Sequence, residues 1–283
     1  MIPPLRIAHR GASGSGLAPE NTLAACERAL REGVDAIEID VHATLDGHVV
    51  VLHDSTLDRT TDRSGEVARM TFAQVREADA GAWFGAELAG ERVPSLAEVL
   101  ELARRRAMVV IEVKADHIAE RVLQTIAAAG AVDRVVLQSF SAETVRRLKV
   151  LEPRIPAAWL LGRVVPGPTR PRARRLVRQL LELGASAASM WCGTLTAAFV
   201  EELRLRALSV WTWTVDEEAA LRSAISMGVD GIITNYPDRL NRVLDELQQG
   251  GHLLPAAGRR SRWVRHRLWR RPRGGAHSER GGG

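Results

Sequence analysis

Histidine and carboxylate side chains occur in a fixed order near the start of this chain. His9 follows an apolar run at residues 5–8, Glu38 and Asp40 lie in a run that begins at residue 36, and His53 follows residues 49–52. Polar groups at the ends of strand-like runs are typical of active sites carried at one edge of a sheet. The spacing therefore predicts an active site assembled from several strand ends.

Three acidic side chains are the candidate metal ligands. Residues two apart on a strand share a face, so Glu38 and Asp40 point the same way, as do Glu112 and Lys114. Carboxylates at Glu38, Asp40 and Glu112 that converge without fixed cationic partners repel one another, and a hard divalent cation relieves this repulsion through oxygen ligands. No Cys or His cluster has the spacing of a zinc site, so Mg²⁺ or Ca²⁺ is favoured, and the sequence does not choose between them.

The remaining candidate residues suit proton transfer and anion binding. His9 and His53 are candidate acid and base groups because imidazole titrates near neutral pH. Arg10 offers a planar fork that fits a phosphate, and Lys114 adds a point charge. Trp213 is either a core residue or a surface for a substrate's carbons or cationic head group. Taken singly, such acids are also helix caps or ion-pair partners, but the whole set favours cleavage of a phosphodiester.

Alternating strand-like and helical segments must position these residues. Helical periodicity separates most of eight apolar runs, at residues 5–8, 36–41, 108–113, 135–140, 157–161, 186–189, 209–215 and 231–234. Gly33, Gly130, Gly184 and Gly228 each follow a helical stretch, where a left-handed C-terminal cap favours glycine. This alternation predicts a (β/α)8 TIM barrel, with an open doubly wound sheet as the alternative.

A hairpin is expected to return His53 to the carboxylates. The Asp46-Gly47 pair between two β-prone runs predicts a two-residue turn. In that register Leu45 faces His48 and Asp40 faces His53, at the rim of the barrel. The following residues, 55–94, are too long for a simple connection and are expected to form an insertion that acts as a lid or specificity element.

The chain divides by charge into a body and a tail. The net charge is +5, but the nine arginines and one glutamate after residue 250 supply +8, which leaves −3 to residues 1–250. We expect residues 1–250 to form one barrel domain and residues 251–283 a basic, disordered tail. Cys26 and Cys192 provide no disulfide framework, and neither a signal peptide nor a long apolar span is visible, so a cytoplasmic location is expected.

Ordered motifs over roughly residues 5 to 245 resemble the glycerophosphodiester phosphodiesterase family. The motifs that carry this resemblance are His9-Arg10-Gly11, Pro19-Glu20-Asn21-Thr22, Glu38-Ile39-Asp40-Val41, Leu52-His53-Asp54, Ile111-Glu112-Val113-Lys114 and Trp211-Thr212-Trp213-Thr214.

The resemblance implies a particular reaction and mechanism. It implies a (β/α)8 barrel that hydrolyses glycerophosphodiesters to sn-glycerol 3-phosphate and an alcohol. A divalent cation would lie at Glu38, Asp40 and Glu112, and His9 and His53 would transfer protons while the substrate's 2-hydroxyl forms a cyclic phosphate. Arg10 and Lys114 would hold the phosphoryl oxygens, and Glu20 and Asn21 would support the site.

Two other functions stay open at this stage. The same catalytic residues would serve a lysophospholipase D that acts on acylated substrates, which a wide apolar groove beside residues 55–94 would favour. Alternatively, the barrel is an inactive module recruited to a membrane, because the tail interleaves arginines with Trp263 and Trp269. We expect a small-molecule glycerophosphodiester substrate, weak contact of the tail with anionic lipid and no nucleic-acid partner; the oligomeric state stays open.

Overall fold

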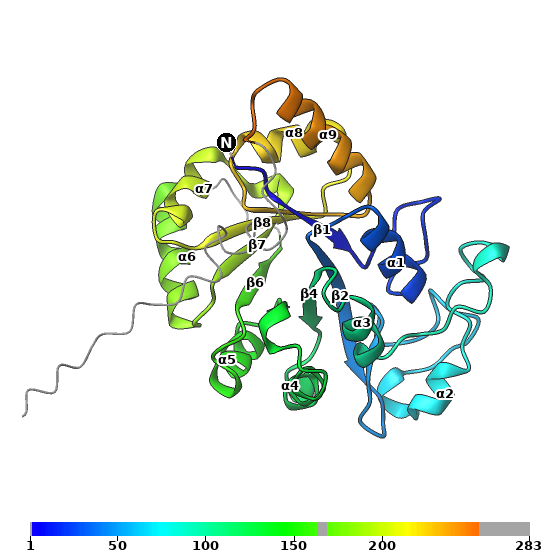
Figure 1. The fold of residues 1–283 in the computed structure, drawn as a ribbon. Helices are drawn as coiled ribbons and strands as arrows, with labels where there is room; N and C mark the ends of the chain where they lie inside the picture. The colour runs from blue at the N-terminus through cyan, green and yellow to red at the C-terminus, as the bar shows by residue number, and fades with distance from the viewer. Residues whose placement is uncertain (1, 163–168, 255–283) are drawn as a thin grey trace, which may run out of the picture.

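The computed structural model describes residues 2–162 and 169–254, and within them eight parallel strands close into a barrel (Figure 1). Strand β1 pairs with both β2 and β9, which joins the two edges of the sheet. A TIM barrel is therefore confirmed, and the open doubly wound alternative is excluded. The barrel strands are β1 (Leu5–His9), β2 (Ala36–Ala43), β4 (Met108–Val113), β5 (Val135–Ser139), β6 (Ala157–Leu161), β7 (Ala187–Trp191), β8 (Ser209–Trp213) and β9 (Gly231–Thr234).

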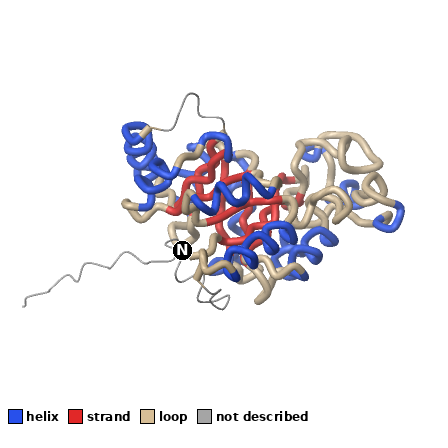
Figure 2. The backbone as a smooth tube through the Cα atoms, turned by 90° about the horizontal axis from the view of Figure 1, so that it is seen from above, coloured by secondary structure: helices blue, strands red, loops and turns tan. Residues whose placement is uncertain are grey.

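Helices surround the strands, as the view from above shows (Figure 2). Thr22, Ser95, Ser141 and Thr196 cap helix N-termini by accepting from the backbone N–H of the third residue further on. The outer helices are α1 (Leu23–Arg31), α3 (Leu96–Leu102), α4 (Ala119–Ala128), α5 (Ala142–Leu151), α6 (Arg170–Glu182), α7 (Ala197–Arg204), α8 (Glu218–Ser226) and α9 (Pro237–Gln249). Short 3-10 turns occupy Asp116–Ile118, Val132–Arg134 and Cys192–Thr194.

The predicted glycine caps are confirmed. Gly33, Gly130, Gly184 and Gly228 all have positive φ, between 57° and 78°, just past a helix. Helix α9 was not expected from the sequence. Its first residue, Pro237, suits a helix start for two reasons. The φ of proline is already close to the helical value, and the N–H that proline lacks would have no partner within the helix at this position.

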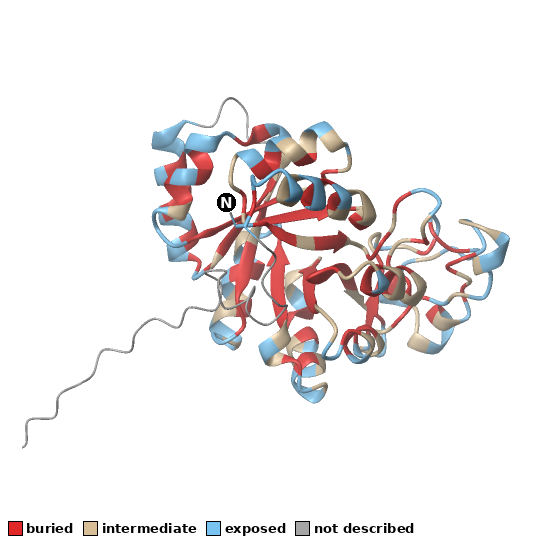
Figure 3. Ribbon diagram, turned by 45° about the horizontal axis from the view of Figure 1, so that its top comes forward, coloured by how far each residue is buried: buried red, intermediate tan, exposed pale blue. Residues whose placement is uncertain are grey.

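Most residues of the barrel strands are buried (Figure 3), and the buried hydrophobic residues form one cluster inside the barrel and others around it. The barrel interior contains Leu5, Ile7, Val110, Trp211 and Ile233, all at most 1% exposed. Two larger clusters lie between the strands and the helices. Since residues alternate along a strand, the face of β1 that carries Leu5 and Ile7 into the core brings His9 to the rim. The packed core thus places polar side chains at one end of the barrel.

A short antiparallel strand, β3 (Val49–Val51), extends the sheet beyond β2, but its predicted register is wrong. Val41 pairs with Val51 rather than Leu52, and the Thr44 N–H donates to the His48 carbonyl, so the loop has three residues. The Asp46 carboxylate accepts from the Thr44 hydroxyl at 2.6 Å and the Phe72 N–H at 3.0 Å. These contacts, with Gly47 at φ 88°, favour the longer loop.

The segment between β3 and α3 forms a small unit beside the barrel, on the side of β2 (Figure 1). It contains the 3-10 turns Val67–Arg69 and Ala86–Leu88 and helix α2 (Phe72–Arg76). Its own apolar cluster includes Val50, Leu52, Leu57, Val75 and Val93. The insertion therefore packs directly on the hairpin that leads to His53.

Two further features concern the rest of the chain. Among the described residues, none of the helices combines the length and the apolarity that crossing a bilayer would require. Residues 255–283, most of the predicted tail, lie outside the described residues, so the expected disorder and lipid contact of that segment stay predictions.

Candidate active site

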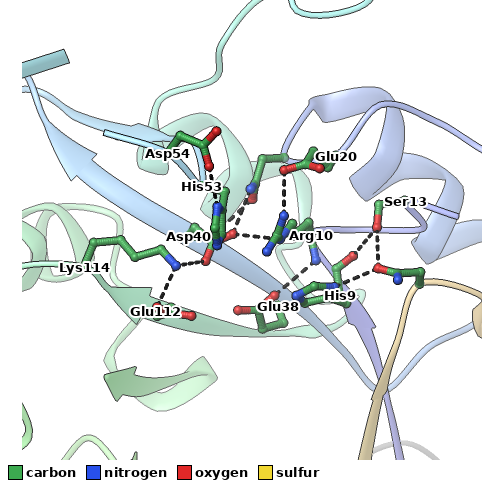
Figure 4. A network of polar contacts seen from close by, with 12 residues as sticks. His9, Arg10, Ser13, Glu20, Glu38, Asp40, His53, Asp54, Glu112 and Lys114 are labelled. Atoms are coloured by element: carbon green, nitrogen blue, oxygen red, sulfur yellow. Dashed lines mark hydrogen bonds and ion pairs between the residues drawn. The ribbon is translucent and has the colours of Figure 1, made fainter. Parts of the chain in front are cut away.

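The three predicted metal ligands converge at the carboxyl ends of two adjacent strands (Figure 4). Glu38 and Asp40 come from β2, and Asp40 is paired in register with Glu112 on β4. Their exposed fractions are 2%, 1% and 7%, and one ligand oxygen from each lies within 4.8 Å of the others. Three buried carboxylates at this spacing form an all-oxygen donor set of the kind that hard divalent cations bind.

Two cations lie beside these acids, which corrects the expectation that the carboxylates lack fixed cationic partners. The Lys114 ammonium lies 2.7 Å from Asp40 Oδ1 and donates to Glu112 Oε1 at 2.7 Å. The Arg10 guanidinium lies 3.2 Å from Asp40 Oδ2, and the Arg10 backbone N–H donates to Glu38 Oε2 at 3.1 Å. Lys114 follows β4, the strand that carries Glu112, whereas Arg10 follows β1, which pairs with the strand that carries Glu38 and Asp40.

The cations compensate the three acids unequally. Burial, with Asp40 and Glu112 nearby, raises the pKa of Glu38 well above its usual value, and burial beside Asp40 raises the pKa of Glu112 to about 7. Burial opposes ionisation of Asp40 too, but Lys114 and Arg10 hold the pKa of that carboxyl below its usual value. Burial and the neighbouring acids therefore disfavour the ionised forms of Glu38 and Glu112, and Lys114 and Arg10 do not fully compensate for this.

Three of these charged groups, Arg10, Glu38 and Glu112, border an open cavity of about 130 Å³. Its polar side contains His9, Arg10, Glu38, His53 and Glu112. Its other side contains Phe140, Leu160, Trp213 and Ile233, from the part of the barrel after β5. Phe140 is 49% exposed and meets the Trp213 ring edge-on, with ring centroids 5.5 Å apart. A charged wall and an apolar wall thus face each other across one opening.

His9 is held by a neutral partner. Its Nδ1 lies 2.7 Å from Asn235 Oδ1. The Asn235 amide nitrogen donates to Asp216 Oδ2 at 2.6 Å, and because a carboxylate only accepts, this contact fixes which end of the amide faces His9. Nδ1 of His9 must therefore carry the hydrogen, which leaves Nε2 unprotonated in the neutral ring. Burial, followed by the charge of Arg10, lowers the pKa of His9 to about 4.

His53 has an anionic partner instead. Its Nδ1 lies 2.6 Å from Asp54 Oδ1, and Arg59 contacts the same carboxylate. Hydrogen bonds from Arg59, and then from His53, lower the pKa of Asp54 to about 2. Asp54 therefore stays ionised and accepts the Nδ1 hydrogen, and the Nε2 position of His53 is left for the cavity. The two imidazoles differ in the charge of the group behind them.

The turn after β1 has an unusual backbone. Arg10 and Asn21 have φ of 55° and 58°, a region that side chains other than glycine seldom adopt. Asn21 supports Asp40 by donating its amide to Oδ2 at 2.9 Å and accepting the Asp40 N–H at 3.3 Å. Gly11 is required here because a Cβ would lie 2.6 Å from the Ala25 backbone. The local backbone is therefore specific to this arrangement of Arg10 and Asp40.

The sequence analysis missed several residues that the structure brings to this site. Gln138 is 1% exposed, donates to Glu38 Oε1 at 3.0 Å, and borders the cavity. The sequence pattern that could have identified Gln138 is a polar residue within an otherwise apolar strand, β5. Asn235 directly follows β9, and Asp216 lies in the loop after β8, where residues of barrel loops often support a site. Glu20, which the sequence did suggest as a supporting residue, accepts from Arg10 at 2.8 Å and from Arg59.

Comparisons with known proteins identify the family. Residues 9–239 match the model of the Glycerophosphoryl diester phosphodiesterase family. A glycerophosphodiester phosphodiesterase of Caldanaerobacter subterraneus subsp. tengcongensis is 35% identical over 87% of this chain and 99% of its own length. A solved glycerophosphodiester phosphodiesterase of Agrobacterium tumefaciens is 31% identical, with a TM-score of 0.74 over 85% of this chain and 100% of the other.

A third relative carries a ligand. The structure of an Oleispira antarctica phosphodiesterase in complex with the product sn-glycerol-3-phosphate is 27% identical, with a TM-score of 0.76 over 86% of this chain and 97% of the other.

Proposed function

Because this chain belongs to the glycerophosphoryl diester phosphodiesterase family and is a phosphoric diester hydrolase, we propose that it cleaves glycerophosphodiesters by metal-dependent acid–base catalysis with His9 and His53. The products would be sn-glycerol 3-phosphate and an alcohol. The observation that carries this proposal is a cluster of three buried carboxylates, two of which, Glu38 and Glu112, border the same cavity as both histidines.

The residues present fit a divalent cation. The donor set consists of oxygens only, and the raised pKa values of Glu38 and Glu112 indicate negative charge that needs compensation. When all three carboxyl groups are ionised, as a bound cation would favour, their charges and those of Lys114 and Arg10 sum to −1. A divalent cation would bring this sum to +1, which suits a phosphodiester monoanion. Bound by Glu38, Asp40 and Glu112, Mg²⁺ or Ca²⁺ would supply charge stabilisation to the phosphoryl oxygens.

His9 is the proposed general base. Its Nδ1 hydrogen is directed at Asn235, so Nε2 is free to accept a proton. In the first step the substrate's own 2-hydroxyl oxygen would form a bond to phosphorus while its proton passes to His9. The lowered pKa of His9 keeps the ring neutral at physiological pH, as a base requires.

His53 is the proposed general acid. The contact of Nδ1 with the ionised Asp54 orients the ring, so that Nε2 is the nitrogen that would deliver a proton in the cavity. That proton would pass to the departing alcohol oxygen as its bond to phosphorus breaks. In the second step water would open the cyclic phosphate, with the two histidines exchanging roles.

Arg10 and Lys114 are the proposed phosphate-binding residues. Arg10 borders the cavity, and its side chain is only 18% exposed because Glu20 and Asp40 hold it. Lys114 bridges Asp40 and Glu112 at the edge of the same cluster. Both cations are therefore held near the position that a phosphoryl group would take.

The cavity supports deacylated rather than acylated substrates. A volume of about 130 Å³ suits a glycerophosphate moiety rather than a long acyl chain. Trp213 and Phe140 offer apolar surface to the glycerol carbons or to a departing choline. A lysophospholipase D would need a longer groove than the one that these residues border.

The decisive experiment measures release of choline from glycerophosphocholine with Mg²⁺ or Ca²⁺. A chelator, His9→Ala and His53→Ala should each abolish most turnover. An analogue without the 2-hydroxyl, a choline phosphodiester of propane-1,3-diol, tests the cyclic intermediate and should not be cleaved. Turnover of that analogue at the normal rate would contradict attack by the 2-hydroxyl, and full activity in either histidine variant would remove that residue from the mechanism.

A further inference from the structure

Arg59 contacts two carboxylates that support the site, one behind His53 and one behind Arg10, although Arg59 itself does not border the cavity. It comes from the insertion, and its side chain is 46% exposed. Its Nε donates to Asp54 Oδ2 at 2.7 Å and its Nη2 to Asp54 Oδ1 at 3.2 Å. Its Nη1 and Nη2 donate to Glu20 Oε2 and Oε1 at 2.9 and 2.7 Å. One guanidinium thus makes two-point contact with two carboxylates.

The carboxylates that Arg59 joins have different tasks. Asp54 accepts the Nδ1 hydrogen of His53 at 2.6 Å. Glu20 accepts from Arg10 at 2.8 Å. Arg59 therefore closes a chain of contacts that runs from His53 through Asp54 and Glu20 to Arg10 (Figure 4 labels these four).

We propose that Arg59 is a positioning residue, which holds Asp54 in the orientation that directs the His53 imidazole at the leaving group. This inference rests on the proposed function, in which His53 is the general acid. Asp54 is the residue next to His53, and without an external contact its carboxylate is free to rotate away from Nδ1. The planar fork of Arg59 fixes both Asp54 oxygens, one of which receives the His53 hydrogen.

The arrangement predicts a specific chemical defect. When the bond between phosphorus and an alkyl leaving group breaks, the departing oxygen must take a proton, which the Nε2 of His53 supplies. A p-nitrophenolate leaves without that proton. Loss of Arg59 should therefore slow cleavage of alkyl diesters far more than cleavage of aryl diesters, whereas a general loss of structure would slow both alike.

The test compares two substrates with saturating Mg²⁺ or Ca²⁺, glycerophosphocholine and the p-nitrophenyl ester of sn-glycerol 3-phosphate. Because general acid catalysis contributes about 10² to 10⁴-fold, Arg59→Ala should lower kcat for the choline ester about tenfold or more and for the aryl ester less than about threefold. Arg59→Lys should give an intermediate defect, since an ammonium cannot contact both carboxylates at two points. His53→Ala should show the same asymmetry in a larger form.

Arg63 provides a matched control. It lies in the same insertion, is 48% exposed, and pairs with Glu77 at 3.2 Å rather than with a residue of the site. Arg63→Ala should leave both activities within about twofold of the native chain, as surface substitutions generally do. Thermal unfolding of each variant reports whether the chain is folded.

The outcomes separate the two proposals. Equal loss on both substrates in Arg59→Ala, or no loss on either, overturns the role of Arg59 while the asymmetry in His53→Ala upholds the proposed acid. If His53→Ala itself lowers both activities equally, the proposed function of His53 fails, and the inference about Arg59 fails with it. A native chain that cleaves neither substrate overturns both.

Discussion

The two walls of the cavity differ in the side chains that form them. This difference suggests that one wall serves the reaction at phosphorus and the other contacts the rest of the substrate. The charged wall, from β1, β2, β4 and the hairpin, is held by direct contacts among Arg10, Asp40, Glu112 and Lys114. The apolar wall, from β5 onward, presents Phe140 and Trp213, which contact each other edge-on and leave Phe140 half exposed. The first wall is fixed for chemistry at phosphorus, and the second offers surface to the carbons around it.

Metal removal should give the largest effect on turnover, and it should act through the charged wall and leave the apolar wall unchanged. Chelation should lower turnover of glycerophosphocholine by about 10³-fold or more, since a cation contributes several kcal/mol of charge stabilisation. Glu112→Gln should cause a comparable loss and should also abolish the rise in Tm that Mg²⁺ or Ca²⁺ produces in the native chain. Glu182→Gln, on the exposed side of α6, is the control. An unchanged metal-dependent Tm in Glu112→Gln would contradict the assignment.

Removing the base should have the next largest effect. His9→Ala should lower kcat about 10² to 10⁴-fold, whereas His117→Ala, at an exposed position, should not. A base works only when deprotonated, and the pKa of His9 is lowered to about 4 by burial and by Arg10. At saturating Mg²⁺ or Ca²⁺, which would keep the proposed ligands Glu38 and Glu112 ionised, activity of the native chain should therefore fall as the pH drops through about 4. A fall centred near 6.5, the ordinary value for histidine, would contradict this account.

The apolar wall should respond more mildly and in a different parameter. Phe140→Ala should raise KM for glycerophosphocholine by about tenfold with kcat nearly unchanged, since loss of an aromatic contact costs about 1 to 2 kcal/mol. Phe84→Ala is the control, because Phe84 contacts Trp83 in the insertion. A drop in kcat without a change in KM would place Phe140 with the chemistry and would remove the distinction between the walls.

The smallest effect concerns the stability of the charged wall. Hydrogen bonds from Arg59 and His53 lower the pKa of Asp54 to about 2, below an ordinary value of about 3.9. This contribution to stability is present above about pH 4 and is lost as the pH falls toward 2. Native Tm should exceed that of Asp54→Asn at pH 6, and the gap should narrow as the pH falls below about 4 and close only as the pH falls through about 2, with Asp133→Asn as the control. A constant gap would contradict the pairing.

Much of the charged wall was predictable because its residues follow strands and alternate in register. The period of two along a strand and the parallel arrangement of neighbouring strands were enough to predict the positions of Glu38, Asp40, Glu112 and Lys114. The presence of cations beside the acids was visible in the sequence, but whether they pair with the acids depends on side-chain conformation. That is why the acids were expected to lack cationic partners, and the structure corrects this.

Other features depend on contacts between distant segments and were not predictable from local patterns. The hairpin loop is one residue longer than predicted because the Asp46 carboxylate accepts a hydrogen bond from the Phe72 N–H, 26 residues further along. The partner of His9 is Asn235, 226 residues away, and its orientation depends in turn on Asp216. Phe140 looked like an ordinary strand residue, and Gln138 reaches the cavity because β5 pairs with β4 in a register that sets Gln138 beside Glu112.

Diffraction from crystals grown with Mn²⁺ and sn-glycerol 3-phosphate tests the central claim most directly. The account predicts an anomalous peak among Glu38, Asp40 and Glu112, with the phosphate beside it and between His9 and His53. A cation bound elsewhere, or a phosphate that lies away from either imidazole, would contradict it.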